Sequence, residues 1–305
     1  MNTVEEKIIM YLGGGAMSGC YGAGVLKGLY DQSGTSSIEA VYTGSVGALN
    51  AAYLLSDQVE IGPTIYFEDL QHGFILPFNL FRGTLDLVFN RFIYRIKEEK
   101  AHNVVNVNYI CEIITTQKHL DFEKIRNNPI ELYVKILNVE TGEVEYKSFK
   151  DHPNIDLLKA AIAIKPYFFG QVSIDENMYV DGTIKEPIGI QYILKKYPNK
   201  KIVVVLNEPI ERRFRHYLKN FVEGLVSSLY PYKISLYKLF MEREDAIRKD
   251  IQVCLNNKNV LLLYPNFRNR TRPRTTELAV IRETFDAGVR DSKKIINFLN
   301  TTYEK

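Results

Sequence analysis

The chain has 305 residues, of which 46% are hydrophobic and 25% charged, so it is long enough to bury a sizeable core and has the composition of an ordinary globular protein. The formal net charge is only +3, which gives no reason to expect nucleic acid as a partner. Three scattered cysteines, Cys20, Cys111 and Cys254, exclude a disulfide framework, offer no metal-ligand spacing and fit a reducing compartment.

The N-terminal residues show no sign of a targeting segment. They lack a basic stretch, and the apolar run that follows is too short for a signal peptide. No part of the sequence approaches the roughly 18 apolar residues of a membrane-spanning helix. We therefore expect a cytoplasmic protein, with at most peripheral contact with a membrane.

Strands and helices are expected to alternate along the chain. Ile8–Leu12 has the pattern of a buried strand that runs into glycines, and Tyr21–Tyr30 has that of a helix. Ser37–Thr43 and Val46–Leu55 repeat this order. Further strands are expected at 132–139, 144–149, 172–180, 201–206 and 260–264, and helices at 157–164 and 277–299. This order predicts an α/β fold with helices on both sides of a central, largely parallel sheet, in a single domain over 1–305.

One region differs in character from the rest. Apolar residues crowd the segment from Phe74 to Tyr94, interrupted by Pro77 and Gly83. Two interpretations are open: a cap of short helices over a site, or ordinary helices of the core. The sequence does not decide between them.

A serine stands between a predicted strand and a predicted helix. In Thr43-Gly44-Ser45-Val46-Gly47, small residues flank Ser45, which is the context of a nucleophile elbow. The helix that follows would direct its N-terminus at the serine and stabilise negative charge there. The motif is short, however, and a tight turn that happens to contain serine has the same pattern.

A glycine loop follows the first strand. Residues 13–19, Gly-Gly-Gly-Ala-Met-Ser-Gly, would expose backbone N–H groups in one direction, as an anion or oxyanion site requires. A nucleotide-binding loop is the competing interpretation. The loop lacks the lysine of a phosphate-binding P-loop, and no acidic residue closes the following strand at the dinucleotide-binding distance, although Glu39 is loosely placed. With Ser45 close behind in sequence, an oxyanion hole is the better interpretation.

A third motif is Tyr179-Val180-Asp181-Gly182-Thr183, in which an aspartate ends a strand. Alone, it is a common turn. Together the three motifs resemble the patatin-like phospholipase family, over about residues 8–209. The shared segments are Gly14-Gly15-Ala16-Met17-Ser18-Gly19 running into Gly24-Val25-Leu26, the elbow continuing as Ala48-Leu49-Asn50-Ala51-Ala52, and Pro166-Tyr167-Phe168 ahead of Asp181-Gly182.

The resemblance implies a three-layer α/β/α fold and a serine acyl hydrolase that cleaves fatty acyl esters of phospholipids or lysophospholipids. It implies a dyad of Ser45 as nucleophile and Asp181 as base, an acyl-enzyme intermediate, and no metal or cofactor. The oxyanion hole would be Gly14, Gly15 and Ala16. Motif support would come from Gly19, Gly47 and Gly182. The resemblance does not extend to residues 210–305, which we expect to form the C-terminal part of the same domain, with helices that face the membrane.

Three positions depart from the family pattern. Thr43 and Ala16 stand where the family has glycine, which the site tolerates if both backbones keep negative φ. Ser18 stands where a basic residue is common, which removes a positive charge near the site. These departures leave open a non-catalytic lipid-binding relative. A neutral-lipid esterase or general carboxylesterase on the same fold is another alternative, and a nucleotide-binding protein is a weaker one.

Histidine and basic residues add two further expectations. Only His216 follows Asp181, and its setting among arginines is typical of a solvated helix face rather than of a catalytic triad. Basic and aromatic residues mix in this part of the chain, as suits an anionic membrane surface, although solvated faces have the same pattern. The residues are Arg212, Arg213, Phe214, Arg215, Tyr217, Leu218, Lys219, Phe221, Tyr230 and Lys233, with a second cluster at Arg268, Arg270, Arg272 and Arg274.

Overall fold

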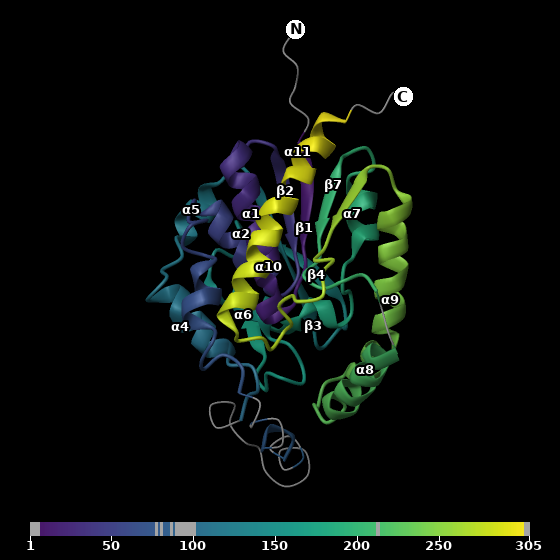
Figure 1. Cartoon of the computed structure of the whole chain (residues 1–305). Helices are drawn as coiled ribbons and strands as arrows, with labels where there is room; N and C mark the ends of the chain where they lie inside the picture. Colours follow the sequence, from purple (N-terminus) through teal and green to yellow (C-terminus); the bar gives the residue numbers. More distant parts are fainter. Residues whose placement is uncertain are drawn as a thin grey trace.

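A central eight-stranded sheet organises the chain (Figure 1). The computed structural model describes residues 7–76, 79, 82–85, 88, 102–211 and 214–301. The strand order is β5-β6-β3-β2-β1-β7-β8, with β4 beside β3. The strands are β1 (Ile8–Leu12), β2 (Ile38–Thr43), β3 (Glu131–Asn138), β4 (Val144–Ser148), β5 (Val172–Ile174), β6 (Asn177–Asp181), β7 (Ile202–Val205) and β8 (Val260–Leu263).

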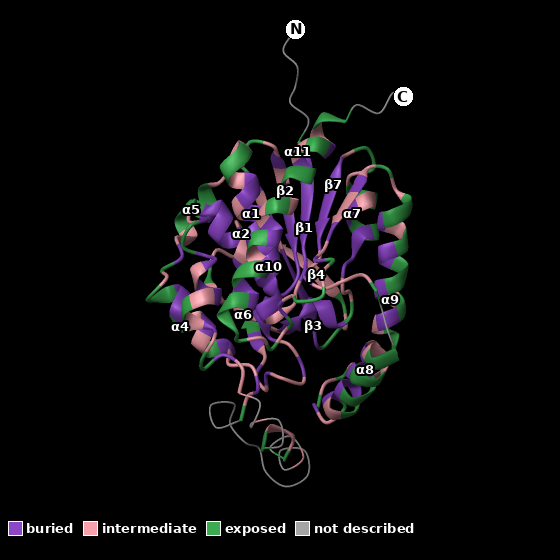
Figure 2. Ribbon diagram, in the orientation of Figure 1, coloured by how far each residue is buried: buried purple, intermediate pink, exposed green. Residues whose placement is uncertain are grey.

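The sheet is largely parallel, as the sequence predicts. Strands β3, β2, β1, β7 and β8 run parallel, while β4 and β6 are antiparallel to β3 and β5 is antiparallel to β6. Helices cover both faces, so the central strands are buried on both sides and consist of continuous apolar runs (Figure 2). This arrangement is the three-layer α/β/α fold.

Alternate side chains of the strands pack against different helices. Ile8, Met10 and Leu12 face the first layer, and Ile9 and Tyr11 face the second. The first layer contains α1 (Cys20–Ser33), α2 (Gly47–Leu55), α4 (Val107–Thr115), α5 (Phe122–Asn127), α6 (Ile155–Ile162), α10 (Leu278–Asp291) and α11 (Lys293–Asn300). The second contains α7 (Ile190–Lys196) and α9 (Leu236–Asn256), with α8 (Phe214–Ser227) leading into α9.

Strand β3 brings two distant strand ends together. Its residues 133–137 pair with β4, so β4 occupies one edge. The other edge is shared: β2 runs parallel and ends with Thr43 opposite Val134, while β6 runs antiparallel and ends with Asp181 opposite Ile136. The two strands therefore meet end to end, two residues apart along β3.

The C-terminal region differs from the prediction in one respect. A single helix was expected at 277–299, but the helix is interrupted at Ser292, between α10 and α11. The Ser292 hydroxyl donates to the carbonyl of Val289 and accepts from the side chain of Gln32, and such local hydrogen bonds compete with continuation of a helix. Because β8 extends the sheet and α10 packs on α1, we propose that the whole chain is one domain.

The apolar segment from Phe74 to Tyr94 lies largely outside the described residues, as do Arg212 and Arg213. Just before this segment, Ile65–Asp69 forms a short π-helix, and Phe74 at the start of the segment is buried. The choice between a cap and core helices is therefore untested. Among the helices that the structure describes, none has the length and apolar content needed to cross a membrane.

Candidate active site

Ser45 stands on the sharp turn between β2 and α2. Its φ is 53°, a left-handed conformation that costs a non-glycine residue about 1–2 kcal/mol and is typical of functional turns. The turn is held by the Gly44 N–H, which donates to the carbonyl of Leu12 at 2.9 Å. A side chain at Gly47 would collide with that same carbonyl group, which explains the glycine there. The predicted elbow geometry is therefore present.

Asp181 ends β6 and is fully buried. Its Oδ1 accepts the backbone N–H of Thr183 at 2.9 Å and the Thr183 hydroxyl at 2.7 Å. Its Oδ2 is buried as well, and no described group donates a hydrogen bond to it. Thr183 also packs on the elbow, because a Cβ on Gly44 would lie 2.6 Å from the Thr183 methyl. One carboxylate oxygen is thus held in place while the other remains available.

Burial raises the pKa of Asp181 above its ordinary value, because a buried carboxylate loses its hydration. The hydrogen bonds from Thr183, the nearby Ser45 hydroxyl and the charge of Arg243 act in the opposite direction. The contribution from Ser45 places its hydroxyl beside the Asp181 carboxylate. A raised pKa makes a carboxylate a stronger base, as proton abstraction from a serine requires.

The glycine loop lies directly against Ser45. A Cβ on Gly14 would sit 2.6 Å from Ser45 Cβ and 3.3 Å from Ser45 Oγ, so only glycine fits. The side-chain amide of Asn207 donates to the carbonyls of Gly13 at 2.7 Å and Gly14 at 3.0 Å. In a trans peptide the N–H points away from the C=O, so the N–H groups of Gly14 and Gly15 point away from Asn207.

The predicted oxyanion donors are backbone N–H groups of this glycine loop. The N–H groups of Gly14, Gly15 and Ala16 make no hydrogen bond to any other described residue. Gly15 has φ 141°, where glycine is favoured, and begins a short 3-10 helix at Ala16–Gly19. Gly19 has no space for a side chain, because a Cβ there would lie 2.7 Å from Val46. Gly182, next to Asp181, is likewise restricted by Lys135 at 2.7 Å.

The three departures from the family pattern have different outcomes. Thr43 lies within β2, and its hydroxyl donates to the carbonyl of Tyr133 at 3.0 Å. The expectation of a negative φ is wrong for Ala16, whose φ is 48°. The glycine loop must turn sharply at Ala16 to present its N–H groups, and alanine adopts this conformation under strain.

Ser18 is buried and bonds to a remote part of the chain. Its hydroxyl donates to the carbonyl of Thr271 at 3.2 Å. Thr271 immediately precedes Arg272, which lines the cavity in front of Ser45. Position 18 therefore carries no charge, and a loop near the C-terminus places the positive charge of Arg272 at the cavity.

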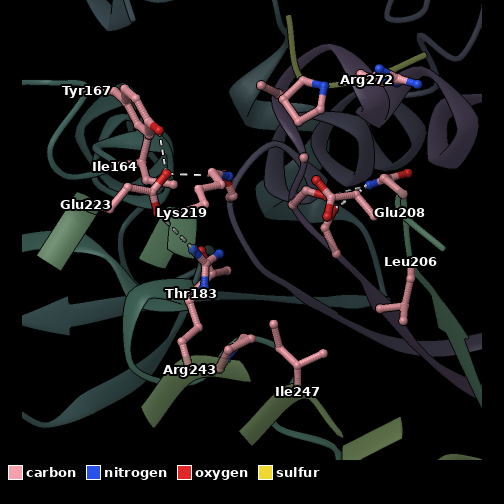
Figure 3. Close-up of a pocket in the computed structure, with 18 of the residues that line it drawn as sticks. Ile164, Tyr167, Thr183, Leu206, Glu208, Lys219, Glu223, Arg243, Ile247 and Arg272 are labelled. Atoms are coloured by element: carbon pink, nitrogen blue, oxygen red, sulfur yellow. Dashed lines mark hydrogen bonds and ion pairs between the residues drawn. The ribbon is translucent and has the colours of Figure 1, made fainter. Parts of the chain in front are cut away.

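A cavity of about 580 Å³ opens in front of Ser45 (Figure 3). Ser45 and the glycine loop line it, whereas the buried Asp181 does not. One group of lining residues is apolar and comes from several elements: Ile75, Val104, Val105, Ile164, Ile188, Leu206, Ile247 and Ile251. The volume and this apolar wall suit an acyl chain.

A second group of lining residues is charged. Glu223 is buried and accepts from the Tyr167 hydroxyl, and its carboxylate lies 3.4 Å from Lys219 and 3.9 Å from Arg243 (Figure 3). Arg272, Arg274 and Glu208 complete this group. Four cations and two carboxylates therefore line the cavity, which favours a substrate with a negatively charged group.

Sequence reasoning missed Asn207, Thr183, Arg243 and Lys135. Lys135 is fully buried on β3, and its Nζ donates to the Ile188 carbonyl at 2.9 Å and the Tyr11 hydroxyl at 3.3 Å. Burial lowers its pKa to about 8, although nearby carboxylates, including Asp181, oppose this shift. The position of Asn207, a polar residue just after a buried strand, could have marked it as a site candidate from the sequence. Lys135 lies inside a strand, and nothing in the local pattern sets it apart. None of the five histidines, all in described segments, lines the cavity.

Comparisons with known proteins identify the family of this chain. The sequence model of the family described as "Patatin-like phospholipase" matches residues 10–194. A structure similar to this one is that of VipD from Legionella pneumophila, with 14% sequence identity, a TM-score of 0.48, and coverage of 96% of this chain and 67% of that chain. A comparison with curated proteins gives no significant match. Because the family match spans more than half of the chain, this protein belongs to the patatin-like phospholipase family of lipid acyl hydrolases.

Proposed function

We propose that this enzyme hydrolyses fatty acyl esters of phospholipids or lysophospholipids with Ser45 and Asp181 as its catalytic dyad. The observation that carries the proposal is the Asp181 carboxylate. Its Oδ1 is held by two hydrogen bonds from Thr183. Its Oδ2 is buried and accepts no hydrogen bond from any described group, and the Ser45 hydroxyl is near this carboxylate. This is the arrangement expected of a base that awaits a proton.

The reaction proceeds in two steps. Ser45 Oγ attacks the ester carbonyl carbon while its proton passes to Asp181. The carbonyl oxygen becomes an oxyanion held by the N–H groups of Gly14, Gly15 and Ala16, each donor being worth about 3 kcal/mol. Asp181 returns the proton to the departing alcohol, which leaves an acyl-enzyme. Water then attacks the acyl carbon and gives a proton to Asp181, which passes it to Ser45 Oγ as the bond to the acyl group breaks and the fatty acid leaves.

The lining of the cavity supports a phospholipid rather than a neutral lipid. The apolar wall would hold the acyl chain, and the cations around Arg272 would contact the phosphate. The absence of a cavity-lining histidine among the described residues supports a dyad rather than a triad. Free Cys20, Cys111 and Cys254 support our proposal that the enzyme works in the cytoplasm.

The test is fatty acid release from mixed phospholipid vesicles by the wild type, Ser45→Ala and Asp181→Asn. We expect release by the wild type and a loss of about 10⁴-fold or more in each variant. Ser56→Ala is the matched control, because Ser56 is a buried serine that does not line the cavity. Parallel assays with triacylglycerol and a soluble short-chain ester separate phospholipase from general esterase activity. A folded wild type that binds vesicles but releases no fatty acid would favour the non-catalytic alternative.

A further inference from the structure

Helix α8 lies at the end of the molecule opposite the two chain termini (Figure 1). It precedes α9, and the two helices pack against each other. For example, the ring of Phe221 on α8 meets that of Tyr237 on α9 at a centroid distance of 6.3 Å. The outer side of α8 is exposed (Figure 2).

The exposed side of α8 is apolar. Phe214 is 80% exposed, Leu218 55% and Val222 52%, and two more residues of the same kind are Phe221 and Leu225. The five residues are spaced by four, three, one and three positions, which places them on one stripe of about 100° around the helix. Exposed apolar residues gathered on a single stripe mark a contact surface, whereas scattered ones do not.

The opposite side of α8 belongs to the candidate site. Asn220, Glu223, Gly224 and Ser227 are buried there. Lys219 and Glu223 line the cavity in front of Ser45. One helix therefore carries the apolar stripe on its outer side and part of the cavity wall on its inner side. Any surface against which the stripe lies would be separated from the cavity only by α8.

The charges exposed on α8 have one sign. Arg215 and Lys219 are exposed and lie along one edge of the stripe, whereas Glu223, the acidic residue of this helix, is buried. Lys233 is exposed in the connection to α9. An apolar stripe bordered by cations is the pattern of a helix that lies in the interface of a bilayer containing anionic lipids.

We propose that the α8 stripe is the surface by which this enzyme lies on an anionic phospholipid bilayer. The stripe enters the boundary of the acyl chains, and the cations contact lipid phosphates. The cavity opening then adjoins the bilayer, so a lipid can reach Ser45 without crossing water. The delivery of lipid to Ser45 rests on the proposed function, but binding of the stripe to a bilayer needs no catalysis. The charged edge and the shared cavity wall favour a bilayer over a second copy of the chain.

The experiment measures vesicle binding and catalysis separately. Binding is measured by co-sedimentation of Ser45→Ala protein with vesicles of phosphatidylcholine alone or mixed with phosphatidylglycerol. We expect binding that is stronger on the mixed vesicles. Adding Leu218→Asp and Val222→Asp should weaken it about tenfold, because both carboxylates would have to enter the interface. With Ser45 restored, the same double variant should lose hydrolysis of vesicle lipid and retain hydrolysis of a soluble short-chain ester.

Leu255→Asp is the matched control, because Leu255 is 54% exposed at the far end of α9. It should bind vesicles as the parent does. Equal binding by the Leu218/Val222 and Leu255 variants, or no binding by the parent, would overturn the proposal. So would a parent dimer that the double variant converts to a monomer with unchanged vesicle binding, since the stripe would then join two copies. Failure of the soluble-ester assay in the wild type would instead count against the proposed catalysis and leave the binding result intact.

Discussion

The side-chain amide of Asn207 donates to the carbonyl oxygen of Gly13 at 2.7 Å and so fixes the orientation of the glycine loop. Its second contact is with the Gly14 carbonyl, and its Oδ1 accepts the N–H of Gly22 at the start of α1. Asn207, which follows β7 in sequence, thus joins the glycine loop to helix α1. The consequence is that the N–H groups of Gly14 and Gly15, which we propose to bind the oxyanion, point away from Asn207.

Asn207→Asp should therefore lower kcat with little change in KM. An aspartate keeps the acceptor for Gly22 but cannot donate to Gly13 and Gly14, whose carbonyls it would repel. We expect a loss of about 10²-fold in kcat on a soluble ester, the size of the effect when an oxyanion donor is lost. Asn128→Asp is the control, because its amide donates to the Leu55 carbonyl away from the cavity. An unchanged kcat in Asn207→Asp would contradict this role.

The rate should depend on the ionisation of Asp181. Because burial raises its pKa, activity should fall with decreasing pH through a midpoint above the usual range of aspartate. Lys135 and Arg243 are the cations near this carboxylate, and Glu186 and Asp250 also face Lys135. Lys135→Met removes a positive charge, so the midpoint should move to higher pH and the rate at neutral pH should fall.

The measurement is the pH profile of kcat/KM on a soluble ester. Lys147→Met provides a control, because Lys147 is a mostly buried lysine on β4 that pairs with Glu145 instead of lining the site. Identical midpoints for the wild type and Lys135→Met would show that Lys135 has only a structural role. Retention of the wild-type midpoint by Lys147→Met would show that the shift is specific to Lys135.

Asp181 should also destabilise the folded protein at neutral pH. Its pKa is raised in the fold, so the folded state binds the proton more tightly than the unfolded chain, and stability falls as pH rises through that window. Asp181→Asn should therefore raise Tm at neutral pH. The gain should shrink as pH falls through the raised pKa, because the wild-type side chain is then also neutral. Thermal unfolding across pH checks this, and a gain that is constant with pH would refute it.

Ala16 stores strain that glycine would release. A left-handed alanine costs about 1–2 kcal/mol, while the greater freedom of glycine in the unfolded chain offsets about 0.4–1 kcal/mol. Ala16→Gly should thus raise the free energy of unfolding by up to about 1.6 kcal/mol, as measured by urea denaturation. Ala23→Gly, within helix α1, should instead lower it by roughly 0.5–1 kcal/mol. If both substitutions destabilise the protein equally, the strain at Ala16 is negligible.

Arg272 should contribute to recognition of a phosphate. Arg272→Gln should raise KM for phospholipid vesicles about tenfold, because the loss of a hydrogen bond between charged groups weakens binding by about that factor. The soluble neutral ester should be hydrolysed at the wild-type rate. Arg268→Gln is the control, as an exposed arginine of the same loop that does not line the cavity. Equal effects on both substrates would assign Arg272 a structural role only.

The sequence by itself determined the local features of this protein. Continuous apolar runs predicted the buried strands, since a strand covered on both faces has no polar side. The small residues around Ser45 predicted the elbow, because only small side chains fit where strand, turn and helix approach so closely. The Asp181-Gly182 pair predicted that Asp181 would end its strand, although not which residues it would face.

Only the tertiary structure decided what meets across the chain. Ser45 and Asp181 are brought together because β2 and β6 end on the same edge of β3. Local periodicity predicts strands, but it does not predict the register in which distant strands pair. Likewise, Arg272 lines the cavity although it is distant from Ser45 in sequence, and Lys135 is buried near Asp181 within an apolar strand pattern. Local sequence encodes backbone conformation and burial, but charge placement and site assembly depend on long-range packing.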